Sequence, residues 1–283
     1  LPVAIVHWLG QQRLLKACCL SDRAIRTGFI CQRKSVLPAC YRRKWLLHLR
    51  STQMMVVMRQ NDGVNTAIPS RTRIKFCGLT RVEDVQFAQA LGVDAVGCIF
   101  APRSPRRIDL AQALQLRAGL SPAQRRPQIV ALVVDADASL LSALRNELRP
   151  DLIQFHGSES GEFCEGHGDA YLRAVPMRNM THLDAWLADY PNASGFVFDS
   201  HAPGGSGGSG QIFDWNALPE DRSKVWLAGG LTADNVAHAV ATVRPFAVDV
   251  SSGIESAPGI KCVEKMQAFV KEVRRADVAA RSQ

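Results

Sequence analysis

The chain has 283 residues and a mass of 31.0 kDa; 47% of the residues are hydrophobic and 21% are charged, as in ordinary globular proteins. This composition excludes a chain that is disordered throughout, and no uninterrupted apolar stretch approaches the roughly 18 residues that a membrane-spanning helix needs. The net charge of +8 is uneven, because residues 1–70 carry a net +9 and the remainder is close to neutral. We therefore expect neither nucleic acid nor a membrane as a partner of the remainder.

Residues 1–70 show no sustained period of 3.6 or 2, and basic clusters occur at 31–34 and 41–44. We expect an irregular, poorly ordered basic extension here, followed by a single domain over residues 71–283. Three interpretations of the extension stay open: sequence translated from upstream of the true start, a small basic binding module, or a targeting segment, which the scarcity of acidic residues would suit.

The eight cysteines contain no Cys-x-x-Cys pair, and their spacings after residue 70 are long and irregular. This pattern favours reduced thiols in a cytoplasmic protein over a disulfide framework. No two of the seven histidines have the spacing of metal ligands, so we expect no metal.

From residue 71 onward, strand-like segments alternate with amphipathic helical ones. Residues 73–78 alternate in character and precede a helical pattern over 82–91 that stops at Gly92. We expect further strands at 95–100, 128–134, 152–156, 171–175, 195–199, 225–228 and 246–250, and helices over 140–148, 183–187, 233–243 and 263–273. The sixth connection contains a glycine-rich loop at 204–210, which we interpret as a mobile lid.

Eight strands alternating with helices favour an α/β fold of the closed (β/α)₈ kind, the TIM barrel. A doubly wound open sheet fits less well, because no Gly-x-Gly-x-x-Gly follows the first strand. In a TIM barrel the chemistry lies at the carboxyl ends of the strands and in the loops that follow them.

Period-two alternation divides each strand between the barrel interior and the helices. The residues that we expect to face inward near strand ends are Lys75, Cys77, Gln154, His156, Val197, Asp199, Asp249 and Ser251. Since the first and eighth strands are neighbours in a closed barrel, Lys75 and Asp249 are predicted to form an ion pair. That pair is either purely structural, or Lys75 also favours the thiolate of Cys77.

Cys77 and Asp199 form a candidate acid–base pair at the rim of one cavity. A cysteine at a strand end is commonly a small buried apolar residue, and an aspartate there commonly caps the next turn. Their joint placement on inward faces favours catalysis.

The loops after the seventh and eighth strands predict a phosphate site. Gly229 and Gly230 follow one strand, and Ser251, Ser252 and Gly253 follow the other. Glycine lets the backbone approach an anion closely, and these two loops hold phosphate in barrels of this type. We therefore expect a phosphorylated small-molecule substrate.

A third loop, at 100–107, carries three arginines and two prolines after the second strand. It is either a solvated run of charge or a constrained basic clamp for a carboxylate or a second phosphate.

Together, the motifs at 75–80, 154–157, 198–200, 213–215, 228–231 and 244–255 resemble those of phosphoribosylanthranilate isomerases of tryptophan biosynthesis, in order, from residue 71 to about 274. The resemblance implies a (β/α)₈ barrel and a cofactor-free Amadori rearrangement of N-(5-phosphoribosyl)anthranilate, an aldose-to-ketose isomerisation. No motif residue departs from the family pattern; the first seventy residues do.

Carried over by position, the resemblance implies that Asp199 is the general acid that opens the furanose ring. Cys77 is then the general base that removes the C2′ proton, and Arg106 holds the anthranilate carboxylate. In the family pattern the phosphate site falls on Gly229, Gly230, Ser252 and Gly253. From their positions at the strand ends, we expect Ser251 to be a further hydroxyl donor and Gln154 and His156 to contact the substrate.

Two other functions stay open. One is a different phosphosugar isomerase of the same barrel type, such as that of histidine biosynthesis, where we expect an aspartate in place of Cys77 and phosphate motifs in both halves. The other is a non-catalytic protein that binds nucleic acid or anionic lipid through the basic extension. For the enzyme we expect a monomer in the cytoplasm.

Overall fold

The computed structural model describes residues 71–178, 180–200 and 213–281, all within one unit, Thr66–Gln283. Eight parallel strands close into a barrel in chain order. They are β1 (Arg73–Cys77), β2 (Ala95–Ile99), β3 (Gln128–Val133), β4 (Leu152–Phe155), β5 (Tyr171–Pro176), β6 (Gly195–Asp199), β7 (Val225–Leu227) and β8 (Ala247–Val250). The predicted TIM barrel is confirmed, whereas the predicted extension lies outside the described residues.

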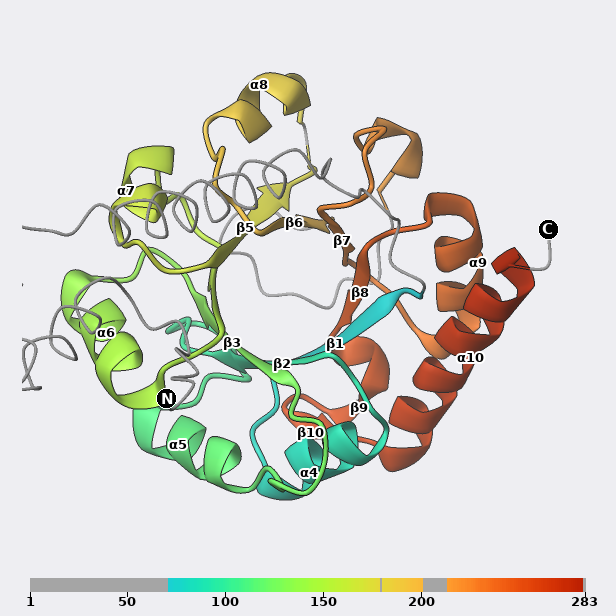
Figure 1. Cartoon of the computed structure of the whole chain (residues 1–283), viewed down its shortest axis with the longest axis horizontal. Coiled ribbons are helices and arrows are strands. Elements are labelled where there is room, and N and C mark those ends of the chain that lie inside the picture. The colour runs from blue at the N-terminus through green and yellow to red at the C-terminus, as the bar shows by residue number, and fades with distance from the viewer. Residues whose placement is uncertain (1–70, 179, 201–212, 282–283) are drawn as a thin grey trace, which may run out of the picture. The chain divides into compact units, whose positions relative to one another are not determined.

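Helices surround the barrel on its outside (Figure 1). They are α4 (Val82–Ala90), α5 (Leu110–Ala118), α6 (Ala138–Ala143), α7 (Gly161–Gly166), α8 (Leu183–Ala188), α9 (Ala233–Val243) and α10 (Val263–Arg281). Within the described ranges, no helix is long and apolar enough to span a membrane.

Three elements differ from the sequence-based expectations. The helix expected over 140–148 divides into α6 and a π-helical turn at Leu144–Leu148, which ends at Arg149 with a left-handed φ of 50°. The last helix, α10, runs to Arg281, because the apolar side chains of Val273 and Ala276 continue its buried face. Between β6 and β7 a 3₁₀ turn at Trp215–Ala217 is described, but the predicted lid at 204–210 falls outside the described residues.

The core has two layers, as the alternation along the strands predicted. Outward residues such as Phe76, Phe155 and Phe198 pack between the barrel and the helices, and Phe76 meets Phe269 of α10 edge to face. The inward residues form a second apolar cluster inside the barrel, made of Ala95, Val130, Leu152, Leu172, Ala174, Val197, Trp226, Ala228 and Ala247. This inner cluster fills the barrel, so the functional groups lie above it, toward the carboxyl ends of the strands.

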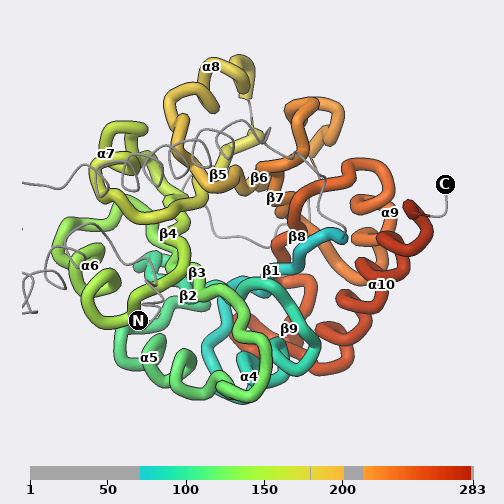
Figure 2. Tube along the Cα trace, viewed as in Figure 1, coloured from blue at the N-terminus to red at the C-terminus, as the bar shows by residue number. Residues whose placement is uncertain are grey.

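The barrel closes where β1 meets β8, and Figure 2 shows these two strands side by side although they stand at opposite ends of the described chain. Lys75 pairs in register with Asp249 across this seam. After β8 the chain makes a short 3₁₀ turn at Ser252–Ile254 and a two-stranded hairpin, β9 (Glu255–Ala257) and β10 (Ile260–Lys261). The sequence-based interpretation did not anticipate this hairpin, and it contributes to the site.

Candidate active site

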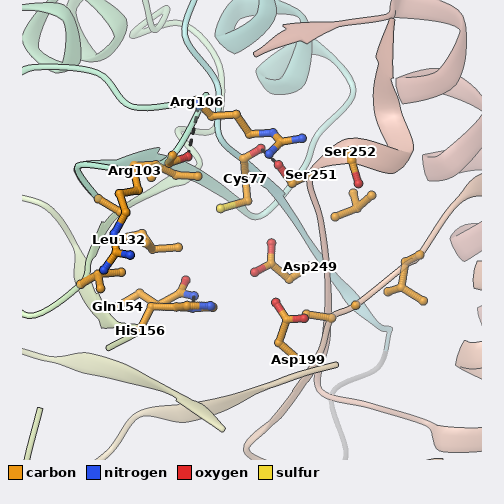
Figure 3. Close-up of a pocket in the computed structure, with 18 of the residues that line it drawn as sticks. Cys77, Arg103, Arg106, Leu132, Gln154, His156, Asp199, Asp249, Ser251 and Ser252 are labelled. Atoms are coloured by element: carbon orange, nitrogen blue, oxygen red, sulfur yellow. Dashed lines mark hydrogen bonds between the residues drawn. The ribbon is translucent and has the colours of Figure 1, made fainter. Parts of the chain in front are cut away.

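A cavity of about 290 Å³ opens at the carboxyl ends of the strands (Figure 3). Its walls combine a small apolar patch with polar groups from most of the strand ends. The predicted site residues that line it are Cys77, Arg106, Gln154, His156, Asp199, Gly229, Gly230, Ser251 and Ser252. Gly253 is the predicted site residue that does not line it.

Cys77 and Asp199, the two candidates for proton transfer, are the last residues of β1 and β6. Both side chains point into the cavity, with Asp249 between them in the view of Figure 3. Cys77 is buried, at 5% exposure, beside the apolar side chains of Ile99 and Leu132. A thiol and a carboxyl group that are distant in sequence therefore share one cavity.

Burial raises the pKa of the Cys77 thiol above its ordinary value. The charges of Lys75 and Lys261 act in the opposite direction and lower this pKa, while that of Asp249 raises it further. Lys75 therefore acts on the Cys77 pKa in the direction that the functional interpretation of the ion pair expected, although the net shift of this pKa is upward. Burial prevails, and Asp249 offsets part of the Lys75 charge.

The predicted ion pair between Lys75 and Asp249 is confirmed. Lys75 Nζ donates to Asp249 Oδ2 over 2.6 Å and to Gln154 Oε1 over 2.8 Å, and the lysine is fully buried. A buried charge is tolerated only when it is paired and hydrogen-bonded, and both conditions hold here.

The Lys75–Gln154 hydrogen bond determines which ring nitrogen of neutral His156 carries the proton. Because Gln154 Oε1 accepts from Lys75, the amide Nε2 is the group that faces His156 Nδ1, at 3.1 Å. That nitrogen therefore accepts, and the ring proton of neutral His156 resides on Nε2. Burial lowers the pKa of His156, so the neutral ring is favoured.

The loop after β4, which carries His156, is held from outside the barrel by Arg173. Its guanidinium donates to the carbonyl oxygens of Phe155, Gly157 and Glu159 at 2.9, 3.0 and 3.2 Å. The Glu159 carboxylate in turn accepts from the Gly157 amide over 2.9 Å. These bonds satisfy the loop backbone and leave the His156 ring facing the cavity.

Arg106 is engaged by a partner that the sequence analysis did not select. Its Nε and Nη2 donate to the two carboxylate oxygens of Glu255, over 2.8 and 2.7 Å. Lys261 adds a bond to Glu255 Oε1 over 2.8 Å, and all three side chains are buried. Although burial opposes it, the hydrogen bonds from Arg106 and Lys261 hold the pKa of Glu255 below its usual range. The hairpin thus fixes the arginine beside the cavity.

The loop after β7 requires glycine for two separate reasons. Gly229 and Gly230 have left-handed φ values of 85° and 65°. A Cβ on Gly229 would also lie 2.7 Å from Ser200 Oγ and 2.9 Å from its amide nitrogen. The backbone of this loop is therefore exposed at the cavity wall without side chains in front of it.

The loop after β8 is packed against the loop after β7. A Cβ on Gly253 would lie 1.9 Å from the carbonyl oxygen of Leu231, so Gly253 permits the two loops to approach rather than lining the cavity. Ser251 Oγ donates to the Cys77 carbonyl over 3.0 Å, and Lys261 Nζ donates to the Ser251 carbonyl over 3.1 Å. The loop is thereby tied to both the cysteine and the hairpin.

Metal-ligating side chains do not gather in the described part of the chain: no group of three or more His, Cys, Asp or Glu residues there is arranged to hold an ion. The four cysteines that the structure describes, Cys77, Cys98, Cys164 and Cys262, are all free thiols.

Comparison with known proteins identifies one family. Residues 74–272 match the family model of N-(5′-phosphoribosyl)anthranilate (PRA) isomerase. An N-(5′-phosphoribosyl)anthranilate isomerase of Xanthomonas campestris is 49% identical over 215 residues, which cover 73% of this chain and 95% of the relative.

Solved structures agree. The phosphoribosyl anthranilate isomerase of Thermotoga maritima matches with a TM-score of 0.62 and 32% identity, over 72% of this chain and 99% of that one. A phosphoribosyl anthranilate isomerase in complex with reduced 1-(o-carboxyphenylamino)-1-deoxyribulose 5-phosphate matches with a TM-score of 0.61 and 30% identity, with the same coverage. Monomers have been generated from the dimeric Thermotoga maritima enzyme, so more than one oligomeric state occurs among the relatives.

Proposed function

The chain belongs to the PRA isomerase family, and on that premise we propose how its own residues catalyse the isomerisation of N-(5′-phosphoribosyl)anthranilate in tryptophan biosynthesis. The observation that carries the proposal is the convergence on one cavity of Cys77, Asp199 and the two loops after β7 and β8. A substrate that spans this cavity places its sugar between the thiol and the carboxyl group.

Binding uses the two ends of the substrate. The glycine loop at Gly229 and Gly230, together with Ser252, offers backbone and hydroxyl donors to the phosphate. Arg106 donates hydrogen bonds to Glu255 from Nε and Nη2. We assign its remaining nitrogen, Nη1, to the anthranilate carboxylate. The substrate is thereby held at both ends, so its sugar is positioned between the reacting groups and the entropic part of the activation barrier is lowered.

Asp199 begins the reaction as a general acid. Its carboxyl proton goes to the furanose ring oxygen while the bond from C1′ to that oxygen breaks, and the nitrogen lone pair forms a protonated Schiff base, C1′=NH⁺. Cys77 then acts in its thiolate form as the general base. It removes the proton from C2′, and the electrons of that bond form the enolamine, which tautomerises to the ketone. Each positioned proton transfer contributes roughly 10²–10⁴-fold to the rate.

Turnover of PRA by the full chain tests this assignment. We expect Cys77→Ala and Asp199→Asn each to lower kcat by about 10²-fold or more, with little change in the affinity for the reduced product analogue. The matched control is Cys98→Ala, because Cys98 is a buried β2 cysteine that faces the helices rather than the cavity. Retention of activity within threefold in either site variant would refute the assignment.

We assign the whole activity to residues 71–283. The support is that 73% of the chain covers 95% of the Xanthomonas campestris relative. A chain that begins at Arg71 is expected to match the full chain in kcat/KM.

A monomer in the cytoplasm is the proposed native state. In the described residues, the exposed large hydrophobic side chains are Ile260, Val263 and Val278, too few for the apolar interface of an obligate dimer. The free thiols suit a reducing compartment. Sedimentation of the full chain at micromolar concentration checks the monomer.

A further inference from the structure

The two carboxylate oxygens of Asp249 have different roles. Oδ2 accepts the hydrogen bond from Lys75 over 2.6 Å. Oδ1 is buried and has no hydrogen-bond partner within the described part of the chain, and Asp249, at 7% exposure, lines the cavity. A buried acceptor without a donor is unfavourable, so such an atom in a cavity wall indicates a donor that arrives with a ligand.

The orientation of this carboxylate is fixed. Lys75 is fully buried, and it donates to Asp249 Oδ2 on the adjacent strand β8 and to Gln154 Oε1 on β4, a strand that does not pair with β1. Asp249 is the acidic half of the ion pair with the Lys75 ammonium, and a carboxylate only accepts hydrogen bonds. Oδ1 therefore presents a fixed, charged acceptor to whatever occupies the cavity.

We propose that Asp249 Oδ1 binds the substrate by accepting a hydrogen bond from a hydroxyl group of its sugar; this inference rests on the function proposed above. The charged ends of the substrate are excluded as partners, since a carboxylate repels both the phosphate and the anthranilate carboxylate. In Figure 3, Asp249 lies between Cys77 and Asp199. The sugar atoms between the C2′ proton and the ring oxygen therefore face it, and their donors are hydroxyl groups.

In the proposed mechanism, Asp249 also lies near the C2′–H bond from which Cys77 removes the proton. Both residues belong to the closing seam of the barrel, and the charge of Asp249 raises the pKa of the Cys77 thiol. A hydroxyl bound to Oδ1 neutralises part of that charge and fixes the sugar beside the sulfur. Asp249 thus orients the carbon chain for proton removal without itself exchanging a proton.

The test measures binding of reduced 1-(o-carboxyphenylamino)-1-deoxyribulose 5-phosphate to the full chain by calorimetry. The same measurement is made with analogues that lack one sugar hydroxyl at a time, and with one in which a methylene replaces the amine N–H. A hydrogen bond to a charged acceptor predicts a roughly ten- to hundredfold loss of affinity for at least one deoxy analogue.

The matching protein variant is Asp249→Asn. Its amide oxygen must face the Lys75 ammonium, so the NH₂ group turns toward the cavity and a donor replaces the acceptor. We expect the parent analogue to bind more weakly to this variant, and the critical deoxy analogue to bind both proteins within about threefold. Asp94→Asn is the control, because Asp94 is another buried, ion-paired aspartate that does not line the cavity.

A paired replacement, Lys75→Met with Asp249→Leu, removes the acceptor without leaving a lone buried charge, and it serves if Asp249→Asn does not fold. Equal affinity of the wild type for all deoxy analogues overturns the proposal, as does an unchanged hydroxyl preference in the folded variants. Loss of binding confined to the methylene analogue assigns Oδ1 to the amine instead and also overturns it. Failure of the wild type to bind the parent analogue contradicts the proposed function itself.

Discussion

Gly97 of β2 leaves room for the sulfur of Cys77, the proposed general base, and Gly97→Ala tests this role of the glycine. Gly97 pairs in register with Cys77. A Cβ on Gly97 would lie 2.8 Å from Cys77 Sγ and 3.1 Å from Cys77 Cα. The second contact is to backbone, so the strain falls on the more mobile sulfur.

The size of the effect follows from these distances. An unstrained contact needs about 3.5 Å, so the sulfur must move by roughly 0.7 Å away from the added methyl group. A displacement of about 1 Å in a reacting group costs on the order of 10²-fold in rate. Overpacking adds a loss of stability of about 1–3 kcal/mol. We therefore expect kcat to fall by roughly 30- to 100-fold, with the affinity for the reduced analogue nearly unchanged.

The assay is steady-state turnover of PRA, with calorimetric binding of the reduced analogue and urea unfolding alongside. Gly166→Ala is the matched control, because a Cβ on this residue of α7 has no neighbour within 4 Å. It should keep full activity and gain stability slightly, as alanine is the better helix former. A kcat within threefold of the wild type in Gly97→Ala would refute the steric argument.

Three further predictions concern the charged groups of the site. Because burial raises the pKa of Cys77, alkylation of this thiol by iodoacetamide, followed by the mass of the peptide that carries Cys77, should still accelerate with pH above about pH 9, and a rate that levels off below about pH 8 would contradict this. Burial lowers the pKa of His156 in the folded state, so its contribution to stability is present above about pH 6.5 and is lost as the pH falls below it. Urea midpoints at pH 7.5 and 5.5 should therefore differ more for the wild type than for His156→Asn; an equal difference would exclude this linkage. Lys75→Met leaves the buried Asp249 carboxyl group without its ion-pair partner, so the free energy of unfolding should drop by about 3–5 kcal/mol, and a loss below about 1 kcal/mol in urea unfolding would show that the pair contributes little.

The parallel barrel was predictable because period and topology agree in this sequence. Strand residues such as Phe196 and Phe198 alternate with Val197, and the structure sends the two phenylalanines outward and the valine inward. Once the barrel was assumed, the seam between the first and last strands followed, and with it the ion pair of Lys75 and Asp249. Local alternation and closure together determine these contacts.

The residues that hold Arg106 in place, Glu255 and Lys261, were not predictable in the same way. Glu255 and Lys261 belong to a hairpin whose strands have only three and two residues, too short for a periodic signal. The contact between Glu255 and Arg106 joins residues that are 149 positions apart. The one available signal was chemical: an arginine expected beside a cavity needs a carboxylate, and Glu255 ends the last motif. Net pKa values also escaped prediction, because the burial of Cys77 depends on side chains from neighbouring strands.

The seam between β1 and β8 also determines when, during synthesis of the chain, the barrel can close. Lys75 leaves the ribosome 174 residues before Asp249, which corresponds to roughly 9–35 s of synthesis. During that interval β1 is an open sheet edge that carries a lysine destined for the interior, and its charge keeps it hydrated and unattractive to other edges. Products of premature termination never receive the compensating aspartate, so they retain an unsealed edge and are exposed to proteolysis.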